Sequence, residues 1–244
     1  MRSVLVWDIP TRFFHWLFAV SFAVAFVTAE LDGLAVVHVF AGLLALGLVV
    51  FRLIWGFAGS RYARFSSFLF SPQAALRHLA DTFRGKPERH VGHNPAGSWA
   101  IYLLLTLGLG ITISGLTMLF VGEQVKEFHE VLAYAALTVV AIHLVGVLVT
   151  SLKQRENLPR SMVTGRKEGD DAHGIPSARP GAAAVMLVLV ASFSFSYWSG
   201  WDAQTESVKL PFLSQPLQLG EQDKDKEGHH SAGHHSGKHE EDDD

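Results

Sequence analysis

The sequence predicts an all-α membrane protein, in which a bundle of four transmembrane helices is followed by a fifth transmembrane helix. Hydrophobic residues make up 49% of the 244 residues and gather in five separate blocks. Each block is about as long as the roughly 20 residues that a helix needs to cross a bilayer. The blocks cover approximately residues 13–29, 34–57, 98–121, 128–152 and 181–199.

The first two blocks are expected to form an antiparallel pair of helices. The first block follows Pro10 and carries His15 in its first turns. The polar residues Asp8 and Arg12 come just before it and argue against a cleaved signal peptide, whose leading region is short and basic. The connection over residues 30–33 is so short that the second helix must return beside the first.

The second block places three notable residues on nearly one helix face. His38 lies near its start, at the membrane surface opposite His15. Gly42 follows one turn later, where the missing side chain would let a flat ligand approach the backbone. Arg52 comes fourteen residues after His38. We interpret it either as an interfacial anchor or as the partner of a ligand carboxylate.

The fourth block contains two histidines, whereas the third contains none. His129 and His143 are fourteen residues apart. At about 100° per residue, fourteen steps return to within roughly 40° of the starting direction, so both side chains leave one helix face. They are then about 21 Å apart along the helix axis. Because ionisable groups inside a membrane span are usually functional, this pattern favours metal ligands over histidines that merely pack between helices.

The linkers after the second and fourth blocks are basic. They carry Arg61, Arg64, Arg77, Arg84, Lys86 and Arg89 in the first case, and Lys153, Arg155, Arg160, Arg166, Lys167 and Arg179 in the second. Basic linkers stay in the cytoplasm, so the N-terminus is predicted to be cytoplasmic and the C-terminal tail periplasmic. The first linker should include a short surface helix from about Pro72 to Arg84. Its histidines, His78, His90 and His93, are expected to be solvated.

The chain is therefore divided into residues 1–155, the four-helix membrane domain, residues 156–180, a cytoplasmic linker, residues 181–200, the fifth transmembrane helix, and residues 201–244, an acidic, His-rich tail expected to be disordered. Neutral imidazoles beside carboxylates suit divalent metal ions. The tail histidines that would form such a site are His229, His230, His234, His235 and His239. Disorder without metal binding is the alternative for the tail.

The predicted helix directions pair the four membrane histidines by depth. His15 and His143 lie near the cytoplasmic surface, and His38 and His129 lie near the opposite one. Two imidazoles per level, in apolar surroundings, are what a six-coordinate haem takes from a protein, whereas zinc or copper would need three or four ligands at one depth. The absence of cysteine excludes disulfides, thiolate-held iron–sulfur clusters and covalently attached haem. Two non-covalent haem b groups are thus predicted.

Several segments resemble the bacterial cytochrome b561 family, and within it the b-type cytochrome subunits of nickel–iron hydrogenases. These segments are VWDIPTRFFHW at 6–16, HVFAG at 38–42, FRLIWG at 51–56, GHNPAG at 92–97 and FHE at 128–130, followed by His143. The similarity covers roughly residues 1–155. It implies four helices that bind two haems and exchange electrons between membrane quinone and a redox partner. His15, His38, His129 and His143 match ligand positions of the family.

The expected function is electron transfer across the bacterial inner membrane, between the quinone pool and a periplasmic c-type cytochrome, reductase or hydrogenase unit. No catalytic residue is assigned, and whether the chain is itself a quinol-oxidising enzyme subunit is left open. Nucleic acid is not an expected partner, whereas membrane lipid is. The alternative is a metal-handling membrane protein that uses the His-rich tail. The span histidines argue against it, because a transporter places polar groups along one continuous path.

Overall fold

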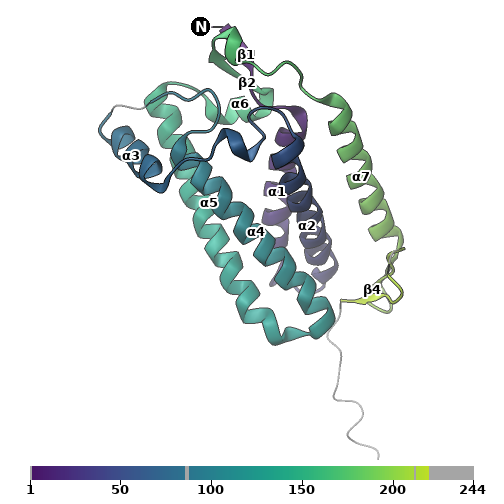
Figure 1. The fold of residues 1–244 in the computed structure, drawn as a ribbon. Helices are drawn as coiled ribbons and strands as arrows, with labels where there is room; N and C mark the ends of the chain where they lie inside the picture. Colours follow the sequence, from purple (N-terminus) through teal and green to yellow (C-terminus); the bar gives the residue numbers. More distant parts are fainter. Residues whose placement is uncertain (1, 86–87, 212, 220–244) are drawn as a thin grey trace, which may run out of the picture.

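Five long apolar helices dominate the protein, which is described by a computed structural model (Figure 1). The model describes residues 2–85, 88–211 and 213–219. The long helices are α1 (Ile9–Thr28), α2 (Ala35–Ala58), α4 (Pro95–Val121), α5 (Lys126–Gln154) and α7 (Pro180–Ser199). Each is long and apolar enough to cross a membrane. The predicted all-α membrane architecture is confirmed.

Shorter elements connect these helices. They are α3 (Pro72–Phe83), α6 (Leu158–Thr164), the 3-10 turns η1 (Phe65–Ser67), η2 (Glu123–Val125) and η3 (Asp171–His173), and the strands β1 (Arg2–Leu5), β2 (Arg166–Gly169), β3 (Trp201–Asp202), β4 (Ser207–Val208) and β5 (Leu217–Gln218). The surface helix predicted in the first linker is α3. The sequence-based prediction did not include α6 or the strands.

Local sequence signals set where the helices begin. The side chain of Asp8 accepts a hydrogen bond from the backbone N–H of Thr11 at 2.8 Å and so caps α1. Asn94 caps α4 in the same way through the N–H of Gly97. In both helices a proline occupies the first turn, where its missing N–H costs nothing. These caps and prolines explain why α1 begins at Ile9 and α4 at Pro95.

The long helices pack as two antiparallel hairpins, α1 with α2 and α4 with α5 (Figure 1). Helix α2 also contacts α4, and α7 runs along α1 and α2. The central cluster of buried side chains draws on α1, α2, α4 and α7. It contains Phe14, Leu44, Leu48, Leu105 and Met186. The fifth transmembrane helix is therefore packed against the bundle rather than separate from it.

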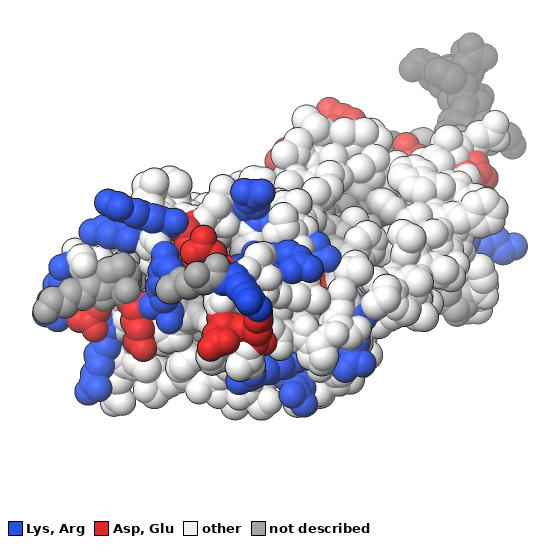
Figure 2. Space-filling view, turned by 90° about the horizontal axis from the view of Figure 1, so that it is seen from above, with Lys and Arg blue, Asp and Glu red and all other residues white. Residues whose placement is uncertain are grey.

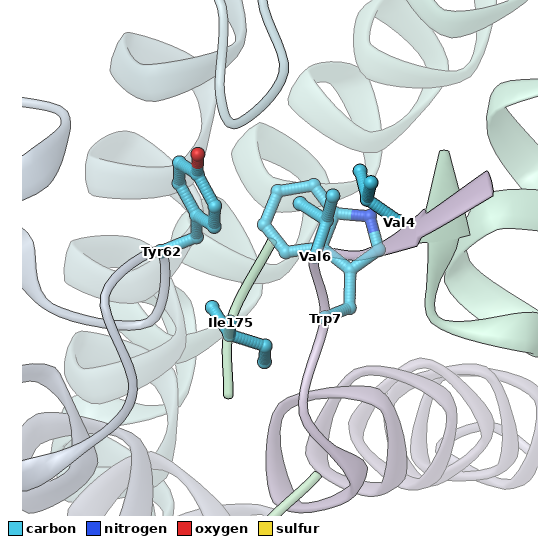
Figure 3. Close-up of a cluster of buried hydrophobic side chains, with 5 residues drawn as sticks. All are labelled: Val4, Val6, Trp7, Tyr62 and Ile175. Atoms are coloured by element: carbon cyan, nitrogen blue, oxygen red, sulfur yellow. The ribbon is translucent and has the colours of Figure 1, made fainter. Parts of the chain in front are cut away.

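One end of the bundle carries a small folded unit, here called the basic cap, made of residues 2–8, 59–85, 88–94 and 155–178. Strand β1 pairs antiparallel with β2, with Arg2 opposite Gly169 and Leu5 opposite Arg166. The cap encloses its own apolar cluster, shown in Figure 3, of Val4, Val6, Trp7, Tyr62 and Ile175. Figure 2 looks onto this end and shows many Lys and Arg side chains at its surface.

A glycine allows the N-terminal segment to join the basic cap. The carbonyl oxygen of Gly165 accepts hydrogen bonds from the N–H groups of Val6 and Trp7 at 2.8 and 3.0 Å. Gly165 has a φ of +78°, and an added Cβ would lie 2.7 Å from the carbonyl oxygen of Trp7. A larger residue would therefore both strain the turn and separate the two segments.

The opposite end is covered by residues 201–211 and 213–219, here called the C-terminal strap. Strands β3, β4 and β5 form an antiparallel sheet in that order. The hydroxyl of Tyr197 donates a 2.8 Å hydrogen bond to the carbonyl oxygen of Val36, next to a buried cluster that includes Val208, Leu210 and Leu217. The sequence predicted disorder from residue 201 onward. The structure instead contains the three strands β3, β4 and β5 between Trp201 and Gln218. The tail histidines, His229 to His239, lie outside the described residues.

Candidate functional site

The imidazoles of His38 and His129 face each other at the strap end of the bundle. Their ring centroids are 6.2 Å apart, and the ring planes make an angle of 68°. His38 comes from the first turn of α2 and His129 from the first turn of α5. Because the two helices start at the same end of the bundle, the sequence places both rings at the same depth.

Hydrogen bonds leave one nitrogen of each of these rings available as a ligand. Nδ1 of His38 lies 2.8 Å from the carbonyl oxygen of Ala25, which can only accept, so Nδ1 carries the proton. Nδ1 of His129 lies 3.0 Å from Oγ of Ser114, whose own hydroxyl proton is donated to the carbonyl of Ile111. Ser114 therefore accepts from His129. In both rings Nε2 keeps its lone pair, the form that binds a metal.

The spacing of these two rings fits a metal ion between them. With metal–nitrogen bonds of about 2 Å and about 1 Å from each nitrogen to its ring centre, two imidazoles on opposite sides of an ion have centroids about 6 Å apart. The 6.2 Å separation of His38 and His129 agrees with that value. Two neutral imidazoles are a donor set that would suit a b-type haem, which would supply a one-electron couple at its iron.

His15 and His143 lie together closer to the basic cap. The two side chains are close enough for their charged forms to repel one another. Nδ1 of His15 is buried and has no hydrogen-bond partner among the described residues. The ring of His15 also contacts Trp16 edge-on, with centroids 5.1 Å apart. The four histidines thus fall into two pairs at two depths, in the combination that the helix directions predicted.

Open space lies beside the His38–His129 pair. A Cβ built on Gly42 would have no heavy atom within 4 Å, so the face of α2 beyond His38 is uncrowded. Only 6% of the most apolar window of α5 is buried, although this helix supplies one histidine to each pair. Most of the surface of α5 is therefore left for lipid or for a ligand to cover. The residues present at the His38–His129 level fit a haem.

Arg52 is buried near the basic-cap end of α2, with an exposed fraction of 3%. Its guanidinium carbon lies 4.9 Å from the ring centre of Phe65, and it interacts electrostatically with Asp8 and Tyr102. Its Nη1 atom has no partner in the described part of the chain. The burial argues against the anchor interpretation, in which the guanidinium would reach the membrane surface. An unsatisfied buried donor is suited to a ligand carboxylate.

Two linker histidines are not solvated, contrary to the expectation from sequence. His78 is 7% exposed and lies 5.4 Å, between ring centroids, from His90. The ring of His93 lies between Trp7 and Phe68, with centroid distances of 4.6 and 4.4 Å. Burial, with smaller contributions from the charges of Arg52 and Lys167, lowers the pKa of His93 to about 3. The adjacent Asn94-Pro95 helix start was the signal that this segment is held against the bundle.

No cluster of three or more His, Asp or Glu side chains suited to a metal ion occurs within residues 2–85, 88–211 and 213–219. The metal-handling alternative therefore depends on the tail histidines, which lie outside that part of the chain. The described part of the chain offers the two histidine pairs as candidate ligands, one toward each end of the bundle. Fold and site together define an integral-membrane b-type cytochrome.

Comparison with known proteins gives the family. The model of the prokaryotic cytochrome b561 family matches residues 6–165, and the chain belongs to this family. The resemblance inferred from the sequence motifs is thereby confirmed. Membership implies haem b and membrane electron transfer. Helix α7 and the C-terminal strap lie outside the matched region.

Curated proteins similar to this chain are described as b-type cytochrome subunits. A probable Ni/Fe-hydrogenase B-type cytochrome subunit of Rhizobium leguminosarum bv. viciae is 21% identical over 215 residues, covering 68% of this chain and 89% of the relative. Proteins with the same description from Bradyrhizobium diazoefficiens and Rhodobacter capsulatus are 22% and 20% identical, each over 69% of this chain and 87% and 83% of the relative. No solved structure matches.

Proposed function

We propose that the chain binds two haem b groups, one between His15 and His143 and one between His38 and His129, and carries electrons across the bacterial inner membrane. The observation that supports this best is the facing pair His38 and His129, whose centroids are 6.2 Å apart and whose Nδ1 atoms are both engaged. Each bound haem would supply a one-electron couple at its iron. The two levels are about 21 Å apart by the helix rise.

The proposed electron exchange is with membrane quinone at one end. Oxidation of one quinol releases two electrons and two protons and leaves a quinone. Because each haem iron accepts one electron, the two electrons must be transferred one at a time. Arg52 would hold a propionate of the haem at the His15 level, since its buried Nη1 lacks a partner in the described chain. Gly42 would let the other macrocycle approach the backbone of α2.

The basic cap is proposed to face the cytoplasm, because basic segments are retained there. The strap end would then face the periplasm, where a redox protein could dock. This end exposes acidic side chains at Glu30, Asp32, Glu127, Asp202 and Glu206. They would favour a partner with a basic surface. A hydrogenase subunit is one such candidate, by the names of the relatives, and a c-type cytochrome or a reductase is another.

The proposal is tested with the purified protein in liposomes. We expect a lipid-soluble quinol to reduce the haems, which is seen as a change in their absorption bands. The reduced protein should then pass electrons to an externally added basic cytochrome c. The rate of electron transfer to cytochrome c should fall as salt is added, because the salt screens the acidic side chains of the strap end. If no quinol reduces the protein and its dithionite-reduced form gives no electrons to an added cytochrome, this function is excluded and only haem binding remains.

A further inference from the structure

Helix α3 carries large apolar side chains that the described part of the chain leaves uncovered. Leu76, Leu79 and Phe83 are 67%, 43% and 71% exposed. At about 100° per residue the three positions fall within roughly 60° of one another, so they form one face of the helix, here called the apolar stripe. Apolar side chains gathered in this way indicate contact with something other than water, whereas single exposed ones do not.

The buried face of α3 holds the helix against the rest of the protein. It contains Ala75, His78 and Thr82 and lies about 100° around the helix from the apolar stripe. Helix α3 packs against α4, and the ring of His78 meets that of His90 edge-on, with centroids 5.4 Å apart. The apolar stripe is therefore separate from the contacts that fix α3 in the fold.

The third face of α3 is charged. Arg77, Asp81 and Arg84 are exposed and lie about 130° around the helix from the apolar stripe. Arg84 pairs with Asp81 at 3.7 Å, which leaves the charge of Arg77 unpaired among the described residues. Apolar side chains on one exposed face and cations on another are typical of a helix that lies in the plane of a membrane surface.

A hydrogen bond sets the depth of α3 relative to the membrane-spanning helices. Nε1 of Trp99, in the second turn of α4, donates to the carbonyl oxygen of Phe70 at 3.0 Å, just before α3 begins. Trp99 is partly exposed, and tryptophan is typical of the boundary between lipid and water. Figure 1 shows α3 to the side of the bundle, at its basic-cap end. Helix α3 thus lies where α4 enters the membrane.

We propose that α3 is an interfacial helix that binds a phospholipid leaflet, with the apolar stripe among the acyl chains and Arg77 beside the phosphates of anionic lipids. The leaflet around α4 reaches this depth, because the exposed apolar surface of α4 begins at Trp99 and continues through Leu103. A soluble protein docked on the stripe would have to displace that lipid. The basic cap adds positive charge, which favours anionic head groups (Figure 2). The inference does not depend on the proposed electron transfer.

The test uses the full-length haem protein in nanodiscs, with single cysteines that carry a bimane label. The chain has no cysteine of its own, so each label has one site. Leu76→Cys and Phe83→Cys report on the apolar stripe, Asp81→Cys on the charged face, and Val188→Cys on the lipid-exposed part of α7. Quenching is compared between lipid with a nitroxide on its acyl chain and iodide in the water. Unchanged haem absorption bands show that each variant is assembled.

We expect the ratio of lipid quenching to iodide quenching at the two stripe positions to be about fivefold or more above that in Asp81→Cys, and close to that in Val188→Cys. Equal ratios at the three positions of α3 would overturn the proposal, because the stripe would then face water. Protection of the stripe from both quenchers would also overturn it, because protein rather than lipid would cover these side chains.

Hydrogen exchange of the α3 amides tests the contact with phosphate separately. Arg77→Gln should make the exchange of residues 72–83 about fivefold faster in phosphatidylglycerol nanodiscs, because a cation near an anionic surface stabilises the bound helix. In phosphatidylcholine nanodiscs the same substitution should have little effect. Arg160→Gln, which removes an exposed cation of α6, is the control and should leave the exchange of α3 unchanged in both lipids. Equal acceleration by Arg77→Gln in both lipids, or none in either, would overturn the contact of Arg77 with anionic head groups.

Discussion

Ser114 Oγ lies 3.0 Å from Nδ1 of His129 and passes its own proton to the carbonyl of Ile111. The hydroxyl therefore fixes both the orientation and the tautomer of an imidazole that comes from a neighbouring helix. Partners of this kind typically change metal affinity by about 10- to 100-fold when they are removed. The proposed haem at the strap end would therefore depend on Ser114, a residue that is not one of its ligands.

We expect Ser114→Ala to weaken haem retention at the His38–His129 level by about tenfold and to leave the other level unchanged. The measurement is haem release to excess apomyoglobin, followed as two spectral components. Thr117→Val is the matched control, because its exposed hydroxyl bonds only within α4, to the carbonyl of Ile113. Equal release from the wild type and Ser114→Ala would contradict this role.

Arg52→Leu should lower the reduction potential of the haem at the His15 level, because a buried cation stabilises the more negative reduced form. A tenfold change in the equilibrium corresponds to about 59 mV for one electron, and we expect a shift of about that size. Redox titration of both components measures it. Arg64→Leu, which removes an exposed cation of the basic cap, should shift neither potential. Two unmoved potentials in Arg52→Leu would exclude the propionate contact.

Tyr197→Phe should loosen the C-terminal strap without disturbing the haems. The substitution removes one buried hydrogen bond, the 2.8 Å contact to the carbonyl oxygen of Val36, worth about 1 kcal/mol. Opening of the strap should become about fivefold more frequent, seen as faster protease cleavage within residues 201–219. Ser199→Ala, whose exposed hydroxyl bonds within α7, should cleave at the wild-type rate. Faster cleavage in both variants would point to general destabilisation instead.

His93 should make the basic cap sensitive to acid. Its pKa is lowered to about 3 in the folded protein by burial and, to a smaller extent, by Arg52 and Lys167. In the unfolded chain the ring takes up a proton near pH 6.5. The stabilising contribution of neutral His93 to the free energy of unfolding is therefore fully present above about pH 6.5. It is lost progressively as the pH drops toward 3.

Thermal unfolding of the basic cap at pH 7.5 and 5.5 checks the role of His93. We expect the unfolding temperature of the cap to fall less between pH 7.5 and 5.5 in His93→Phe than in the wild type. His173→Asn, which changes an exposed histidine of the same cap, should behave like the wild type. An acid-induced loss of the same size in His93→Phe would assign the pH dependence to other groups.

The membrane helices could be predicted because the bilayer fixes both their length and their composition. The pairing of His15 with His143 and of His38 with His129 followed from helix direction and the fourteen-residue spacing, two properties that do not require knowledge of contacts. Periodicity does not define how one helix is rotated against another, so Ser114 was not identified as a partner of His129. The burial of Arg52 was likewise left open by the sequence.

Contacts between distant segments account for the rest of what the sequence did not reveal. Strands β1 and β2 are four residues each and pair across more than 150 positions, so neither shows a strand signal of its own. The strap was hidden because Val208, Leu210 and Leu217 lie in a short segment interrupted by Pro211 and Pro216, and they are buried only through their packing with Val36 and Tyr197. His93 is buried by Trp7 and Phe68, which come from two other segments of the chain.

The central claim is that two haems are held by two specific histidine pairs, and the most direct measurement is the reduced-minus-oxidised spectrum of four single variants. His15→Ala and His143→Ala should lose one and the same spectral component, and His38→Ala and His129→Ala should lose the other. Each variant should retain about half of the wild-type haem, with the remaining component unchanged in its bands. Loss of a shared component in His15→Ala and His129→Ala, or a wild type containing a single haem, would contradict the account.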